Sequence, residues 1–169
     1  MTQTLGPYVT NEQSSTFAIN NNGLVNSHVI ATMGTIEAPI TAADDTIILC
    51  SVPVDAKLIE VSLAFDDLDS DVAPDSTMHL GLFSDDGDGT FTVVDADILA
   101  ASIDVGTAAV ALTNYRFSAQ NISTAQMPVW DIALSARPAY DQLYIGLTTA
   151  VSTAGTIVGT ISFRVLYSI

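Results

Sequence analysis

The segment FSDDGDGTF, residues 83–91, contains the residue types that come closest to a metal site in this sequence. Calcium prefers oxygen ligands, and an EF-hand loop supplies them around a glycine at its sixth position. With Gly89 at that position, the candidate calcium ligands are Ser84, Asp86, Asp88 and Asp95. The match is partial, because a serine stands first and an aspartate stands where the bidentate glutamate belongs.

The residues around this segment indicate a different structure. An EF-hand needs a helix on each side, whereas MHLGLF (78–83) and FTVV (91–94) alternate like strands. Two Asp-Gly steps supply residues that tolerate positive φ, as the turn of a β-hairpin requires. The sequence therefore favours a β-hairpin, with a weak calcium site as the alternative.

A second acidic segment, FDDLDSDVAPD (65–75), contains five carboxylates. Paired carboxylates can perform acid–base chemistry, so Asp66, Asp67 and Asp69 define a candidate hydrolase site. However, no nucleophile accompanies them, and aspartate is common in loops. We predict a solvated turn after a strand, with Leu68 pointing inward.

Other catalytic signals are missing from the sequence. Cys50 lies in the apolar run TIILCSV, where we predict a buried, inert thiol. The two histidines, His28 and His79, have no nucleophile motif beside them, and neither a Gly-x-Ser-x-Gly motif nor a phosphate-binding loop occurs. We predict that the chain is not an enzyme and needs no cofactor.

The charge of the chain is strongly one-sided. There are 19 acidic residues against 4 basic ones, which gives a net charge of −15 over 169 residues. Nucleic-acid and anionic-membrane partners need clustered Lys and Arg, so we expect neither. With no basic or apolar leader at its start and no apolar run long enough for a membrane helix, the chain is expected to be made in the cytoplasm.

Alternating apolar residues predict strands over KLIEVSLAF (57–65), TMHLGLF (77–83), QLYIGLTTAV (142–151) and TIVGTISFRVLYSI (156–169). Helix is expected only as one or two turns over Asp95 to Ser102, while AQMPVWDIALSA (125–136) is ambiguous. Many strands with Gly- and Asp-rich turns predict an all-β sandwich of jelly-roll kind. Its predicted core consists of Ile59, Val61, Leu63, Leu80, Leu82, Leu143, Ile145, Leu147, Ile161, Phe163 and Val165.

The first part of the chain differs from the rest. Residues 1–34 are rich in Asn, Thr, Ser and Gln and have no helical period. We interpret them as an extended N-terminal arm, and residues 35–169 as the β-sandwich domain. A strand-and-loop entry into the domain is the alternative.

From residue 52 onward, the order of segments resembles small virion proteins of tailed bacteriophages, in particular head decoration (cement) proteins. The similarity rests on VPVDAKLIEVSLAFDDLDS, then HLGLFSDDGDGTFTVVDADILAASIDV, and finally AGTIVGTISFRVLYSI. It implies a β-sandwich on the outer capsid, often a homotrimer, that binds neighbouring subunits of the major capsid protein.

We therefore expect a capsid decoration protein on the surface of a virion. The arm would then bind a neighbouring subunit, with Tyr8, Phe17 and Leu24 as anchors. The alternative is a phage tail or fibre component with a receptor- or glycan-binding sandwich. Glycan sites usually offer aromatic platforms, and here aromatic residues make up only 7% of the chain.

Overall fold

The computed structural model describes residues 3–5, 17–20, 28–37, 45–69, 76–106, 109–115, 127–151 and 158–169. These residues form ten strands and one short helix. In chain order they are β1 (Gln3–Leu5), β2 (Phe17–Asn20), β3 (His28–Glu37), β4 (Thr46–Pro53), β5 (Lys57–Phe65), β6 (Thr77–Asp85), β7 (Phe91–Asp104), β8 (Val110–Asn114), α2 (Val129–Ala133), β9 (Gln142–Val151) and β10 (Thr160–Ser168).

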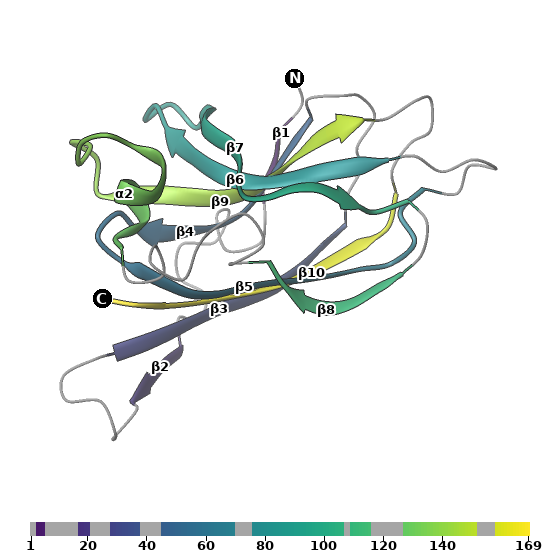
Figure 1. Ribbon diagram of the computed structural model, residues 1–169, viewed down its shortest axis with the longest axis horizontal. Helices are drawn as coiled ribbons and strands as arrows, with labels where there is room; N and C mark the ends of the chain where they lie inside the picture. Colours follow the sequence, from purple (N-terminus) through teal and green to yellow (C-terminus); the bar gives the residue numbers. More distant parts are fainter. Residues whose placement is uncertain are drawn as a thin grey trace.

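The strands form two layers, seen edge-on in Figure 1. One sheet has the order β1-β4-β9-β6-β7 and the other β2-β3-β10-β5-β8. The antiparallel pairs are nested along the chain: β6 pairs with β7, β5 with β8, β4 with β9 and β3 with β10. This is the topology of a long hairpin rolled into a sandwich, which is the jelly roll. The predicted all-β fold is confirmed.

The strands form because alternate side chains are apolar and face the other sheet. In β10, for example, Ile161, Phe163, Val165 and Tyr167 are buried while the residues between them are partly exposed. All predicted core residues except Ile59 are buried, and so is Leu68. Burial of these apolar side chains is the main stabilising contribution to the sandwich.

Ile59 was assigned wrongly to the core, because its side chain is 41% exposed. The pairing of β5 with β10 shifts register between Leu166 and Tyr167, which leaves one extra residue in β5. Such a bulge reverses the inward and outward alternation beyond it. Leu58, which is 1% exposed, therefore takes the inward position.

The helix predicted over Asp95 to Ser102 is also wrong, since this segment lies within strand β7. Three register shifts against β6 interrupt its alternation and produce a spacing that resembles a helical one. The Asp95 carboxylate does accept a hydrogen bond from the Asp97 N–H at 3.4 Å, as a cap would, but the backbone stays extended. The ambiguous segment instead contains the helix α2, which follows Pro128.

Strand β3 crosses the predicted boundary between arm and domain at residues 34 and 35. It runs from His28 to Glu37 and pairs along its length with β10. Before it, the backbone of β1 pairs with β4 in parallel and that of β2 pairs with β3. The division into arm and domain stays a prediction.

Gly81 in β6 explains how β7 can lie so close to its neighbour. A Cβ atom added at this position would overlap the backbone carbonyl oxygen of Asp95 and the backbone carbonyl of Ala96. Only glycine leaves room for this close approach of backbone. The extra residues of the bulged strand are thus accommodated over a position without a side chain.

Ile145→Ala should lower the free energy of unfolding by roughly 2–5 kcal/mol, because it removes a fully buried side chain from the core. Ile59→Ala is the matched control and should change the free energy by less than about 0.5 kcal/mol, as for other surface sites. Urea unfolding measures both. Equal losses in the two variants would contradict the assignment of the inward face.

Gly81→Ala should destabilise the fold by about 1–3 kcal/mol or more, since backbone would have to move to admit the methyl group. Gly159→Ala is a suitable control, because its Cβ would first meet the end of the flexible Leu68 side chain. Thermal unfolding of the two variants should show the larger loss at position 81. A neutral Gly81→Ala variant would refute the close approach.

Candidate interaction surfaces

The candidate calcium segment is the turn of the β6–β7 hairpin, as the sequence favoured. Gly87 and Gly89 have φ values of +89° and +84°, in the region that glycine tolerates best. The Gly87 N–H donates to Asp85 Oδ1 at 2.8 Å, and the Thr90 N–H donates to Asp88 Oδ1 at 2.8 Å. These aspartates therefore stabilise the turn itself.

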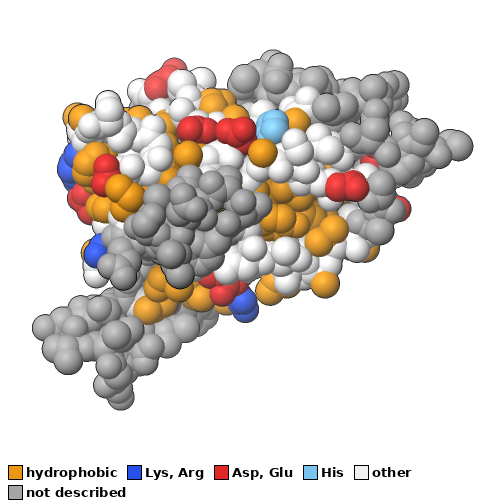
Figure 2. Space-filling model, in the orientation of Figure 1, with side chains coloured by type: hydrophobic (Ala, Val, Ile, Leu, Met, Phe, Trp, Pro, Cys, Tyr) orange, Lys and Arg blue, Asp and Glu red, His pale blue; other side chains and the backbone are white. Residues whose placement is uncertain are grey.

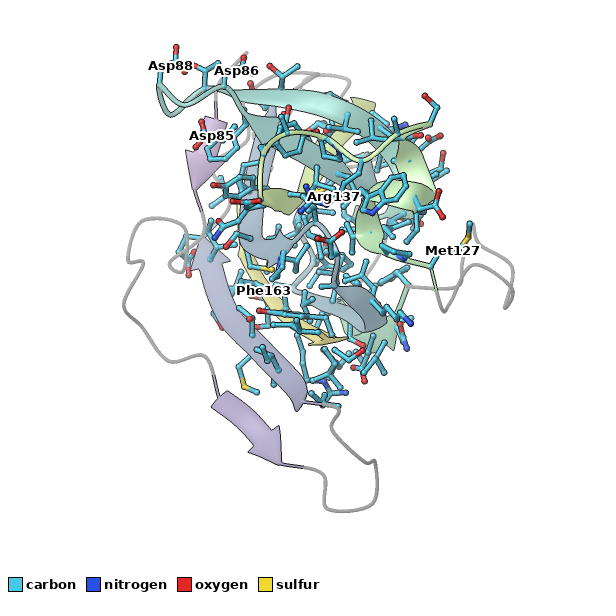
Figure 3. All side chains as sticks on the ribbon, turned by 90° about the vertical axis from the view of Figure 1, so that its left-hand side faces the viewer. Asp85, Asp86, Asp88, Met127, Arg137 and Phe163 are labelled. Atoms are coloured by element: carbon cyan, nitrogen blue, oxygen red, sulfur yellow. The ribbon has the colours of Figure 1, made fainter. Side chains whose placement is uncertain are left out.

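The four candidate ligands are spread along the hairpin. Asp86 and Asp88 lie at its outer tip, whereas Asp95 lies within β7, paired with Leu82 (Figure 3). Asp86 Oδ2 accepts a hydrogen bond from the Thr92 hydroxyl at 2.9 Å, and Ser84 pairs with Thr92 across the strands. In the described part of the chain, no three carboxylate, histidine or cysteine side chains are grouped to hold a metal. The calcium site stays the untested alternative to a plain hairpin turn.

The pKa values of the Asp88 and Asp95 carboxyl groups are shifted in opposite directions. The backbone N–H of Thr90 lowers the pKa of the Asp88 carboxyl, since a hydrogen bond to the charged form favours it. Partial burial raises the pKa of the Asp95 carboxyl, because desolvation disfavours the charge. The two carboxylates therefore belong to different environments.

The second acidic segment does not assemble a catalytic group. Asp66 and Asp67 are exposed, while Asp69 is buried and accepts a hydrogen bond from the Ser76 hydroxyl at 2.7 Å. Asp69 thus joins the residues on either side of positions 70–75. Leu68 is buried as predicted, but Asp69 is buried too, so the expectation of a solvated turn with Leu68 alone pointing inward is only partly right.

Cys50 and His79 each have surroundings that suit a structural role and not a catalytic one. Cys50 is fully buried, and burial raises the pKa of its thiol to about 12, so it stays protonated and unreactive. His79 Nδ1 accepts a hydrogen bond from the Ser102 N–H at 3.1 Å. Ser102 has a φ of 51°, and this bond supports its strained backbone.

An ion pair that the sequence did not suggest joins two loops at one end of the sandwich. Arg137 donates to Asp55 at 2.7 Å and lies 3.7 Å from Asp141. The hydrogen bond from Arg137 lowers the pKa of the exposed Asp55 carboxyl. No local pattern could reveal this contact, because Asp55 and Arg137 are 82 positions apart.

A second apolar cluster lies on the outward face of the β4-β9-β6-β7 layer. Ile48, Phe83 and Phe91 are at most 5% exposed, and Tyr144 packs edge-on against Phe91 with ring centroids 4.7 Å apart. It explains why the run TIILCSV is apolar through most of its length: Ile47 faces the core and Ile48 faces this cluster. Both sides of β4 are therefore buried.

The acidic side chains gather on the hairpin and its edge strand. Strand β7 carries Asp95, Asp97 and Asp104, and the hairpin adds three more aspartates at its turn. Acidic side chains are visible on this layer in Figure 2. Charges along an edge strand oppose pairing with other strands, which limits aggregation.

The opposite sheet presents a surface of different character, which we name the β10 face. It consists of the outward residues of β3, β10 and β5: Val29, Ala31, Met33, Thr35, Glu37, Thr160, Ser162, Arg164, Leu166, Ser168, Lys57, Ile59, Glu60, Ser62 and Ala64. Small side chains and hydroxyl groups predominate. The sequence did not single out this face, because its composition is unremarkable in any one strand.

One ion pair lies near the middle of the β10 face. Arg164 donates to Glu60 Oε1 through Nε at 2.8 Å, and the Ser62 hydroxyl donates to the same oxygen at 2.5 Å. Partial burial raises the pKa of the Glu60 carboxyl, but the hydrogen bonds from Ser62 and Arg164 outweigh it and lower the pKa overall. Glu60 therefore stays charged.

Only one of the three proposed arm anchors lies within the described residues. Tyr8 and Leu24 lie outside the described residues. The backbone of Phe17 lies in β2 and pairs with Ala31 of β3. Their role in partner binding stays a prediction.

Two solved structures are similar to the whole chain. A chain of the capsid of Ralstonia phage GP4 superposes with a TM-score of 0.67 and 23% identity, over 98% of this chain and 96% of that one. A chain of the cyanophage Pam1 capsid asymmetric unit gives a TM-score of 0.55 and 18% identity, over 96% and 99%. The fold is shared. No protein-family model matches the chain, and no curated protein matches it in sequence.

No helix in the described part of the chain is long and apolar enough to cross a membrane.

Calcium removal should leave the melting temperature of the protein nearly unchanged, because the hairpin turn is stabilised by its own hydrogen bonds. Calorimetric titration should detect no calcium site tighter than about micromolar, the range of sensor loops. Asp86→Asn with Asp88→Asn is the matched variant. A tighter site that this variant abolishes would establish the calcium alternative.

Proposed function

We propose that this chain is a structural protein of a tailed-phage virion, in which it decorates the outer surface of the head. The observation that carries the proposal is the similarity to two phage capsid chains over nearly the full length of both partners. Jelly rolls occur in many protein classes, including viral capsids and lectins, so the fold alone does not decide the function.

The character of the described side chains supports a structural role. The thiol is buried, the buried carboxylate of Asp69 accepts a hydrogen bond from Ser76, and the hairpin aspartates stabilise their own turn. These residues include no nucleophile or base placed for catalysis, so we propose that the protein acts by binding partners through its surface. We propose the major capsid protein as the partner and a homotrimer as the assembled form.

Immunoelectron microscopy of intact virions tests the location. Gold particles carrying an antibody to this chain should label the head uniformly, whereas a tail or fibre component would place the label at one vertex or along the tail. Labelling confined to the tail would reject the decoration role. An absence from purified virions would reject the structural role altogether.

We further propose that the segment before β3 tethers the protein to a neighbouring subunit. Strand β3 begins at His28, so a deletion of residues 2–27 spares it. The truncated protein should bind undecorated heads with much lower occupancy, because an extended segment contributes backbone hydrogen bonds and side-chain anchors on docking.

A triple variant distinguishes the contribution of the three anchor side chains from that of the backbone, which the truncation also removes. Changing Tyr8, Phe17 and Leu24 to Ala keeps the chain length, and it should also reduce occupancy. Quantitative gel analysis of sedimented heads measures both variants, and thermal unfolding checks that each remains folded. Full occupancy by the folded truncated protein would exclude the tether.

A further inference from the structure

The β10 face is electrically balanced on a chain that is otherwise strongly acidic. Its charged side chains are Glu37, Lys57, Glu60 and Arg164, so its two negative charges are balanced by two positive charges. Arg137, the other basic residue of the described part, is already engaged with Asp55. A net charge of −15 elsewhere would repel a second copy, and this face would not.

The β10 face also exposes apolar side chains next to small ones. Met33 is 45% exposed and Ile59 is 41% exposed, while Ala31 and Ser62 beside them are nearly covered. The strands β3, β10 and β5 run nine residues or more, so together they span roughly 14 by 30 Å. That footprint is about 420 Å², roughly half of the 800 Å² or so that each partner buries in a standard interface, so the contact is a small one.

The register of the sheet makes the charges self-complementary. Glu37 pairs with Thr160 at one end of β10, and Lys57 pairs with Ser168 at the other end. Arg164 lies midway between these positions on the central strand, about 13 Å along the strand from each. Glu37 and Lys57 are thus placed on opposite sides of one centre, with opposite signs.

We propose that the β10 face binds the same face of a second copy of this chain through a two-fold axis. An axis in the contact plane, passing over Arg164, brings Lys57 of each copy opposite Glu37 of the other. Met33 then lies close to Met33 of the second copy, and each Arg164 keeps its own Glu60 as counterion. Contacts of this isologous kind join copies in pairs.

A different partner fits the same face less well. Any partner could cover the apolar side chains, but the antisymmetric placement of Lys57 and Glu37 is complementary to itself. The inference rests on the charges and register of this face and does not depend on the proposed virion role. Because the contact is smaller than a standard interface, the pair should be weak and reversible. It should form in addition to any rotationally symmetric assembly on a capsid.

Sedimentation equilibrium of the purified full-length protein, from micromolar to submillimolar concentration, tests the proposal. A reversible doubling of mass is expected, from monomer to dimer, or from trimer to hexamer where the proposed homotrimer already forms in solution. Met33→Glu should weaken dimerisation at least about tenfold, as expected for a side chain at the centre of an interface. Val93→Glu places the same charge at another exposed apolar residue, 37% exposed on β7, and should have little effect.

A charge swap tests the two-fold geometry. Lys57→Glu alone and Glu37→Lys alone should each weaken the dimer, because each places like charges opposite one another. The double variant should restore dimerisation, since opposite charges again face each other. Circular dichroism checks that all variants fold. No doubling of mass at any concentration, an equal effect of Val93→Glu, or a failure of the double variant to restore dimerisation would overturn the proposal.

Discussion

The rest of the fold depends on the hairpin between β6 and β7, because it is the innermost of four nested strand pairs. Once its glycine turn closes, β5 and β8 are brought near each other, then β4 and β9, and finally β3 and β10. Each closure shortens the loop that the next pair must close, which lowers its entropic cost. Pairs as distant along the chain as Ile36 and Ile161 therefore become neighbours in the core.

The same nesting places different chemistry on the two outward faces. The hairpin of β6 and β7 contributes one face, and it contains six of the 16 aspartates of the chain. Strands β3, β10 and β5 contribute the β10 face, where the positive and negative charges are equal in number. Since like charges in one region cost less when they are well solvated, the acidic hairpin suits a surface in water and the β10 face suits a contact.

Close backbone packing determines where side chains are tolerated. Gly81 lets the bulged β7 pass over β6, and Gly146 of β9 lies under the ring of Phe83. The ring in turn contributes to the second apolar cluster with Ile48 and Phe91. The layer of β4, β9 and β6 is consequently packed on both of its sides, whereas the outward residues of β10 remain partly exposed.

The sequence by itself determined the fold class, the hairpin turn and nearly the whole core, because period-two alternation and Asp-Gly steps are local signals. It failed where bulges changed the alternation: Ile59 points outward, and the segment from Asp95 is strand. It could not reveal the Arg137–Asp55 ion pair or the balanced charges of the β10 face. These features depend on the register between strands that are distant in sequence, and only the tertiary structure sets that register.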